Sequence, residues 1–417
     1  MKTKTSTTMS TPLHEFINGR RNHVMPTHQR KSKRSTNDQF TAINVGAGDA
    51  FYLQRAAFSV LVDGGQASKF ASRFHKVTGC RGANVVVCTH NDADHANGIV
   101  DFFESNFSAD ECWLPGRWLE CLQSLLTEPE VVVSEIARHV NNTHEAEEAS
   151  DEPTQDAEPI PVDVVSEILE QYADRSSAHD AMFPTIVSGP LLMVHVLPPM
   201  FSVTPTKSQR TLELIEAASN IRKIALAAAR AGVKIRWFHP KEPQKPVRNH
   251  DLHVLNAGEV DYFRRSSKPA RCLELTLMNR ESLVLFAPSN DDSAAVLFCA
   301  DSGLAGVNLP TLSESTLVTA PHHGSSDIEN RKAYAHVTAA AQAAGDSLIW
   351  VRSDRALGPA ASRPCLEFMS QRYRLCTNCR GNGGHGQHVR LAAREGTWTF
   401  GKNASCKCMP NKSVKPH

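Results

Sequence analysis

The feature that most constrains this chain is a run of six residues, His90-Asn91-Asp92-Ala93-Asp94-His95, directly after an apolar stretch. The stretch 83–89 (ANVVVCT) predicts a strand buried on both faces, with chemistry at its carboxyl end. Two imidazoles and two carboxylates this close together suit Zn²⁺ or Mn²⁺. Such a turn can address two ions, and two ions about 3.5–4 Å apart are the usual machinery of phosphoester hydrolysis. The alternative is a polar helix cap in which Asp94 and His95 satisfy backbone donors.

Other predicted strands also end in acidic or imidazole side chains. Strand 58–62 precedes Asp63, strand 295–300 stops at Asp301, and strand 317–320 stops at Pro321-His322-His323-Gly324. Strands that repeatedly end this way predict one site at a common sheet edge. The remaining elements that we expect are strands at 40–45, 50–53, 191–197, 273–278 and 282–287, a helix from about Asn97, and a helix at 208–232.

Six segments, in this order along the chain, resemble motifs of the metallo-β-lactamase fold and, within it, of the hydrolase domain of ComEC-type DNA-uptake proteins. They are 44–50 (NVGAGDA), 61–65 (LVDGG), 89–99 (THNDADHANGI), 279–285 (NRESLVL), 298–301 (FCAD) and 320–325 (APHHGS). The resemblance spans roughly residues 40–350. It implies an α/β fold, a four-layer αββα sandwich with insertions, and a dinuclear metal site where the two sheets meet. His195 is an alternative ligand, although an ordinary strand position fits it better.

The resemblance implies six metal ligands, divided between two divalent ions that would be Zn²⁺ or Mn²⁺. The first ion would be bound by His90 and Asp92, the second by Asp94, His95 and His323, and Asp301 would bridge both.

The resemblance also implies roles for residues around the ions. Asp63 would fix the tautomer of a metal-binding imidazole, or it is a plain turn residue before two glycines. His322 competes with His323 for the last ligand position, and as a non-ligand it could protonate a leaving oxygen. We therefore predict a catalytic group of Asp94, His322 and Asp63, with Ser325 and Arg363 as substrate contacts.

Composition divides the chain into segments of opposite charge, although its net charge is only +1. Residues 1–39 predict a disordered basic arm, because eight Lys and Arg face two acidic residues up to residue 40. We expect the hydrolase domain at 40–362, with a solvated acidic insertion at 141–163 that holds eight acidic residues and no Lys or Arg. Residues 363–417 form a basic C-terminal segment, with ten Lys and Arg against two acidic residues.

The C-terminal segment contains two short cysteine pairs, Cys376 with Cys379 and Cys406 with Cys408. Two such pairs could hold an additional structural Zn²⁺. The C-x-C spacing of the second pair weakens this interpretation. Free thiols in a final strand and redox chemistry are the alternatives.

These observations predict a metal-dependent hydrolase, foremost a phosphodiesterase or nuclease that cleaves DNA or RNA with a metal-bridging hydroxide. Basic ends fit sequence-independent binding of nucleic-acid backbones, although solvated tails fit them as well. The alternatives are hydrolysis of a different ester, a lactone or a lactam, and an accessory subunit that docks partner proteins through its insertions. No apolar stretch is long enough for a transmembrane helix or a signal peptide, so we expect a cytoplasmic protein without membrane contact.

Overall fold

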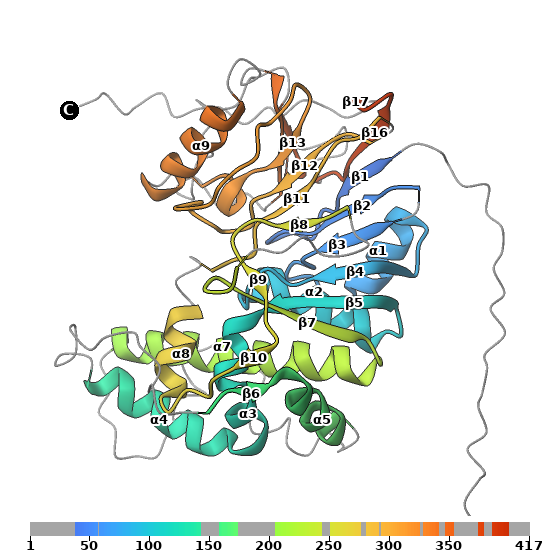
Figure 1. Ribbon diagram of the computed structural model, residues 1–417. Coiled ribbons are helices and arrows are strands. Elements are labelled where there is room, and N and C mark those ends of the chain that lie inside the picture. Colours follow the sequence, from blue (N-terminus) through green and yellow to red (C-terminus); the bar gives the residue numbers. More distant parts are fainter. Residues whose placement is uncertain are drawn as a thin grey trace, which may run out of the picture. The chain divides into compact units, whose positions relative to one another are not determined.

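The computed structural model describes residues 38–56, 58–142, 158–173, 205–243, 251–276, 281–291, 293–325, 328–341, 347–353, 374–378 and 386–399. These residues form mixed β-sheets with covering helices (Figure 1), which confirms the predicted α/β class. Several predictions lie outside the described residues. They concern the basic arm up to residue 37, most of the acidic insertion, His195, Arg363, and three of the four cysteines (Cys379, Cys406 and Cys408) of the zinc site.

The first sheet contains nine strands and includes the strand that leads into the six-residue motif. Its order is β17 (Thr397–Thr399), β16 (Val389–Arg394), β1 (Gln39–Ala42), β2 (Phe51–Gln54), β3 (Ser59–Val62), β4 (Gly82–Val87), β5 (Ser108–Pro115), β7 (Lys234–His239) and β9 (Gly258–Glu259). Strands β3, β4, β5 and β7 are parallel to one another, and the pairs outside them are antiparallel.

The second sheet contains six strands and a parallel half of its own. Its order is β15 (Arg374–Cys376), β14 (Ile349–Arg352), β13 (Leu317–Thr319), β12 (Val296–Phe298), β11 (Leu285–Ala287) and β8 (His253–Val254). Strands β12 to β15 are parallel, whereas β11 is antiparallel to both of its neighbours. A separate ribbon pairs β6 (Ile160–Pro161) with β10 (Tyr262–Phe263).

The side chains of β4 show how the core is divided. Val85 and Val87 belong to the apolar cluster between the two sheets, whereas Val86 belongs to the cluster between the first sheet and its helices. A third cluster packs α9 (Ile328–Ala341) on the second sheet, with the rings of Tyr334 and Trp350 5.3 Å apart. Each sheet is therefore buried on both faces, which explains why its central strands are continuously apolar.

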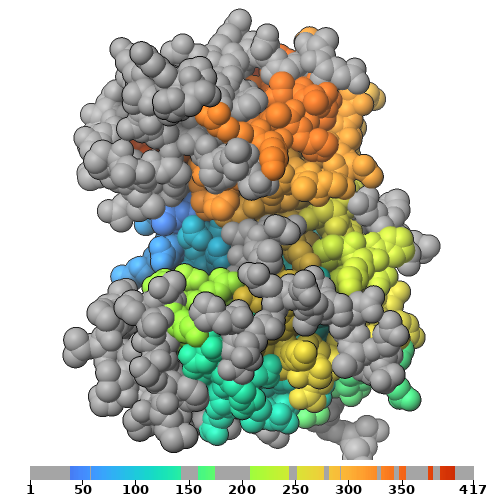
Figure 2. Space-filling view, turned by 90° about the vertical axis from the view of Figure 1, so that its left-hand side faces the viewer, coloured from blue at the N-terminus to red at the C-terminus, as the bar shows by residue number. Residues whose placement is uncertain are grey.

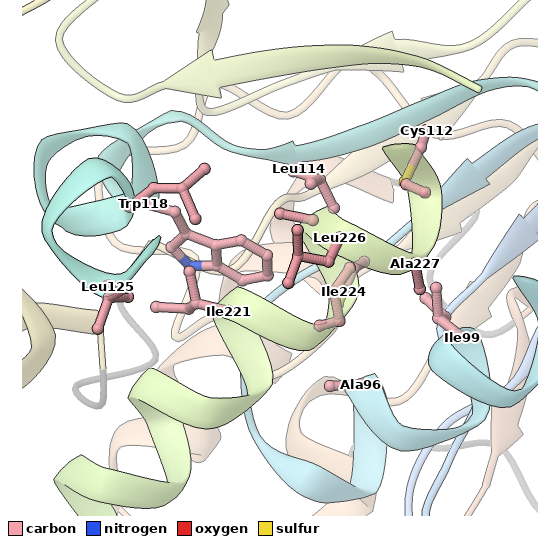
Figure 3. Packing of buried hydrophobic residues seen from close by; sticks show 14 of the residues in the cluster. Ala96, Ile99, Cys112, Leu114, Trp118, Leu125, Ile221, Ile224, Leu226 and Ala227 are labelled. Atoms are coloured by element: carbon pink, nitrogen blue, oxygen red, sulfur yellow. The ribbon is translucent and has the colours of Figure 1, made fainter. Parts of the chain in front are cut away.

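Several helices accompany the first sheet, and the long helix among them confirms the prediction at 208–232. They are α1 (Phe70–Thr78), α2 (Ala93–Glu104), η1 (Gly116–Trp118), α3 (Leu119–Thr127), α4 (Pro129–Asn142), α5 (Val162–Ala173), α7 (Pro205–Arg230) and α8 (Pro269–Thr276). Figure 3 shows Leu226 of α7 beside Leu114 of β5, and Ala227 beside Ile99 of α2. Helix α7 is therefore packed against the helix in which the six-residue motif ends.

Two sequence predictions of local structure are wrong. The predicted strand 273–278 begins in helix α8, because Ala270 and Leu273 share the buried side of that helix, although alternating leucines also fit a strand. Helix α2 begins at Ala93 rather than near Asn97. The last residues of the six-residue motif therefore lie in the first turn of a helix.

The basic C-terminal segment contributes strands to both sheets. Strand β15 pairs with β14 of the second sheet, and β16 pairs with β1 and β17 of the first sheet. The described parts of residues 363–417 thus complete the sheets. None of the described helices is both long and apolar enough to cross a membrane.

Candidate metal centre

The candidate centre lies where parallel strands of both sheets end. Asp63 follows β3, and His90 comes soon after β4, which is parallel to β3. Asp301 comes three residues after β12, and η3 (Pro321–Gly324), which contains His322 and His323, follows β13 almost directly. Because the carboxyl ends of parallel strands share one sheet edge, these side chains can converge from distant parts of the chain.

Two groups of side chains are close enough to hold metal ions. Asp49, His95, Asp301 and His323 form one group, and His90, Asp92 and Asp301 form the other; within each group the ligand atoms lie within 4.8 Å of one another. Asp301 belongs to both, with Oδ1 3.3 Å from His95 Nε2 and Oδ2 3.8 Å from His90 Nε2. The carboxylate of Asp301 is thus shared by the two groups.

Asp94 and His322 border these groups. Asp94 Oδ2 lies 3.2 Å from His323 Nε2, and Asp94 Oδ1 lies 4.0 Å from His95 Nε2. His322 Nε2 lies 3.5 Å from Asp301 Oδ2, but the His322 side chain is 40% exposed, against 11% for His323. Both histidines of η3 have positive φ angles, 47° and 54°. This costly backbone conformation places His323 inside the centre and His322 at its rim.

Each of the three inner histidines is anchored through Nδ1. Asp63 Oδ2 lies 2.8 Å from His95 Nδ1, and Asp49 Oδ1 lies 2.9 Å from His323 Nδ1. The Thr89 hydroxyl donates to Asp63 Oδ2 and lies 2.9 Å from His90 Nδ1. Since a carboxylate accepts, and the Thr89 proton is already donated, all three Nδ1 atoms are donors. In neutral rings each Nε2 therefore carries a lone pair that faces the centre.

The atoms that meet in the middle fit a cation. His95 Nε2 and His323 Nε2 lie only 3.2 Å apart. His90 Nε2 and Asp301 Oδ1 are buried and have no hydrogen-bond partner among the described residues. Imidazole nitrogens and carboxylate oxygens are the donors that zinc and manganese sites use. The residues therefore fit one or two divalent ions, while the kind of metal is not determined by them.

The protonation preferences of the same residues show that the centre attracts positive charge. Burial, and then the charge of His95, lower the pKa of His90 to about 4. Burial alone would lower the pKa of His95, but Asp301 and Asp63 raise it well above its ordinary value. Asp301 and Asp49 likewise raise the pKa of His323 well above its ordinary value, against the effect of burial. The buried carboxylates therefore favour positive charge at this position, which a bound divalent ion would supply.

Two glycines allow the loops of the centre to approach each other. Gly48 has a φ of 91°, and a Cβ atom there would lie 1.6 Å from the carbonyl oxygen of Asp94. The next residue, Asp49, donates its backbone N–H to that same oxygen at 3.2 Å. A Cβ atom on Gly98 would lie 2.0 Å from the carbonyl oxygen of Gly64. Because glycine has no Cβ atom, the loops after β1 and β3 can lie directly against the first turns of α2.

Sequence reasoning missed Asp49 and Thr89. Asp49 lies in the segment 44–50 that was compared with a family motif, so a signal existed, but its only local feature is a glycine turn. Ser325, a predicted substrate contact, donates its backbone N–H to the His322 carbonyl at 2.8 Å. Cys376 is buried in β15, 3.8 Å from an Arg352 nitrogen, and its predicted zinc partners lie outside the described residues.

No protein-family model and no curated protein matches the sequence. Among solved structures, the chain is similar to YhfI from Bacillus subtilis, a metallo-beta-lactamase fold protein, with 19% identity and a TM-score of 0.18. The match covers 21% of this chain and 41% of the YhfI chain, which is less than half of the length of YhfI. The interpretation of the centre therefore depends on its own geometry.

Proposed function

We propose that this protein is a dinuclear metal-dependent hydrolase that cleaves phosphodiesters. The observation that carries the proposal is the carboxylate of Asp301, which is shared by two potential metal-binding groups among three inward-facing histidines. Two ions at such a centre would lower the pKa of water and neutralise charge on a phosphoryl oxygen. This combination suits a phosphodiester, whose transition state carries charge on those oxygens.

The protein side chains have separate tasks in this proposal. Asp63, Asp49 and Thr89 hold three imidazole rings in one tautomer and orientation, so that little reorganisation accompanies the reaction. His322, exposed at the rim and 3.5 Å from Asp301, can hold a proton for the oxygen of the departing alcohol. The proposal retains Asp94, His322 and Asp63 as the catalytic group, with Asp94 beside the ions, 3.2 Å from His323 Nε2.

The same proposal includes the family assignment. The ordered motifs, and the arrangement of helices, two facing sheets and helix α9, support a four-layer metallo-β-lactamase sandwich of the ComEC-type hydrolase kind. A nucleic-acid substrate is supported by the basic ends of the chain, which lie largely outside the described residues. The experiment below therefore tests nucleic acids as substrates as well.

The test combines metal content with hydrolysis. Wild-type protein should contain about two divalent ions per chain and should hydrolyse bis(p-nitrophenyl) phosphate with Mn²⁺ or Zn²⁺, but not after EDTA treatment. Asp301→Asn should lose bound metal and activity while its circular dichroism spectrum is unchanged. Asp291→Asn, which alters an exposed aspartate elsewhere, is the matched control. Wild-type rates in folded Asp301→Asn would contradict the proposal; linear DNA, circular DNA and RNA are tested in parallel.

A further inference from the structure

The carboxyl end of strand β14 lies at the same sheet edge as the candidate centre. Strand β14 is parallel to β13, which leads into η3 and His323. Figure 2 shows orange surface, from the half of the chain that contains η3, beside blue-to-cyan surface from the half that contains β3 and β4. The last residue of β14, Arg352, is 6% exposed, and Ser353, which follows it, is 1% exposed. Because arginine is almost never this deeply buried without partners, the contacts of this strand end indicate its role.

Arg352 holds the backbone of His323. Its Nε atom donates to the His323 carbonyl oxygen at 2.9 Å. Its side-chain stem lies directly against the next residue of η3, because a Cβ atom on Gly324 would be 2.7 Å from Arg352 Cδ. His322 and His323 both have positive φ angles, a conformation that persists only where surrounding contacts stabilise it. Arg352 supplies one such contact, at the residue whose imidazole faces the centre.

Ser353 holds the loop that carries the partner of His323. Its hydroxyl donates to the Gly48 carbonyl oxygen at 2.9 Å. The residue after Gly48 is Asp49, whose Oδ1 lies 2.9 Å from His323 Nδ1. Two consecutive residues at the end of one strand thus contact the two backbone segments from which the Asp49–His323 pair projects.

We propose that Arg352 and Ser353 are positioning residues for the metal ion that His323 would bind. The inference rests on the proposed function, because it takes the imidazole of His323 as a metal ligand. Each residue donates to the backbone on one side of the pair, so the end of a buried strand, rather than the two loops alone, sets the distance between Asp49 and His323. Loss of either hydrogen bond should therefore lower the affinity for this one ion.

The experiment compares two replacements of Arg352 that have nearly the same length. In Arg352→Gln an amide N–H donor stands as many bonds from the backbone as Arg352 Nε, and in Arg352→Met a methyl group stands there. When the metal-free full chain is titrated with Zn²⁺, Arg352→Met should weaken one of two binding steps by about fivefold or more, the loss expected for one hydrogen bond. Arg352→Gln should retain most of the affinity. A role in charge would affect both variants equally, and a role in packing would spare both.

Three further variants locate the effect. Ser353→Ala should weaken the same step, which is the step that Asp49→Asn weakens. Combined with Asp49→Asn, Arg352→Met should add little, because the pair that it positions is already weakened. Arg55→Met is the matched control: Arg55 is 6% exposed and donates to the Ala294 carbonyl at 2.9 Å, but it follows β2, at the edge where β3 begins, opposite the centre. It should lower the free energy of unfolding and leave both Zn²⁺ steps unchanged.

Hydrolysis of bis(p-nitrophenyl) phosphate by the same variants separates this inference from the proposed function. If one Zn²⁺ step weakens as described but the wild type hydrolyses no ester, the proposed function is wrong and the positioning role stands. If the wild type hydrolyses the ester and Arg352→Met retains both Zn²⁺ steps, the positioning role is overturned and the proposed function stands. Equal losses in Arg352→Gln and Arg352→Met, or losses in both steps, would also overturn the positioning role, as would a wild type that binds no Zn²⁺.

Discussion

The substitution Asp49→Asn tests whether the second carboxylate–imidazole pair supports one metal ion in particular. Asp49 is 1% exposed, and its carboxylate holds Nδ1 of His323 at 2.9 Å. Asparagine keeps the shape and an accepting oxygen but removes the charge that makes the imidazole a better ligand. Loss of such an outer partner typically lowers metal affinity by about 10–100-fold, or about 1.4–2.8 kcal/mol. Solvent cannot screen the loss, because the pair is buried.

The assay is a titration of metal-free protein with Zn²⁺ or Mn²⁺ against a chromophoric chelator, which should show two binding steps in the wild type. In Asp49→Asn one step should weaken and the other should remain. Asp63→Asn is the comparison, because Asp63 contacts His95 directly and His90 through Thr89, so both steps should weaken. Unfolding of the metal-free variants checks that they fold. Two unchanged steps, or equal losses in both steps for Asp49→Asn, would refute this assignment.

Three further predictions concern the loops, the metal and the rim. Gly48→Ala should lower the free energy of unfolding by about 3 kcal/mol or more in denaturant titration, because its Cβ would meet the Asp94 carbonyl. Gly46→Ala, at a similar φ of 89° but in open space, should cost only about 1–2 kcal/mol. Chelation should lower the melting temperature, since an ion at about 1,000 times its Kd contributes about 4 kcal/mol. His322→Gln should lower kcat by about 100-fold or more without changing metal content, measured by mass spectrometry; unchanged kcat would exclude it as the proton donor.

The parts of the centre that the sequence revealed are those in which chemistry and strand ends coincide. The six-residue motif directly follows β4, and Asp301 and the histidine pair follow β12 and β13. A buried strand can be recognised from a short apolar run. Its carboxyl end can therefore be located without knowledge of the rest of the chain. The structure brings most of these residues into the two groups, and it places Asp94 and His322 beside them.

The sequence did not reveal residues whose role depends on contacts between distant parts of the chain. Asp49 reaches His323, 274 positions away, through a glycine turn that by itself has no chemical signature. The predicted strand at 273–278 was wrong because alternating leucines satisfy two periodicities, and only burial of Ala270 with Leu273 distinguishes the helix.

The charge of the chain ends and the charge of the candidate centre bear on different steps of recognition. Basic residues near the termini would act on encounter, which depends on fields that extend over about one Debye length, roughly 10 Å at 0.1 M salt. Cleavage at the centre depends on side chains within contact distance, and there the inner histidines and Asp301 meet. Basic ends therefore favour an anionic partner without making a polyanion the substrate. High salt should weaken association with DNA while leaving hydrolysis of bis(p-nitrophenyl) phosphate largely intact, and a parallel loss of both would show that one electrostatic surface serves both steps.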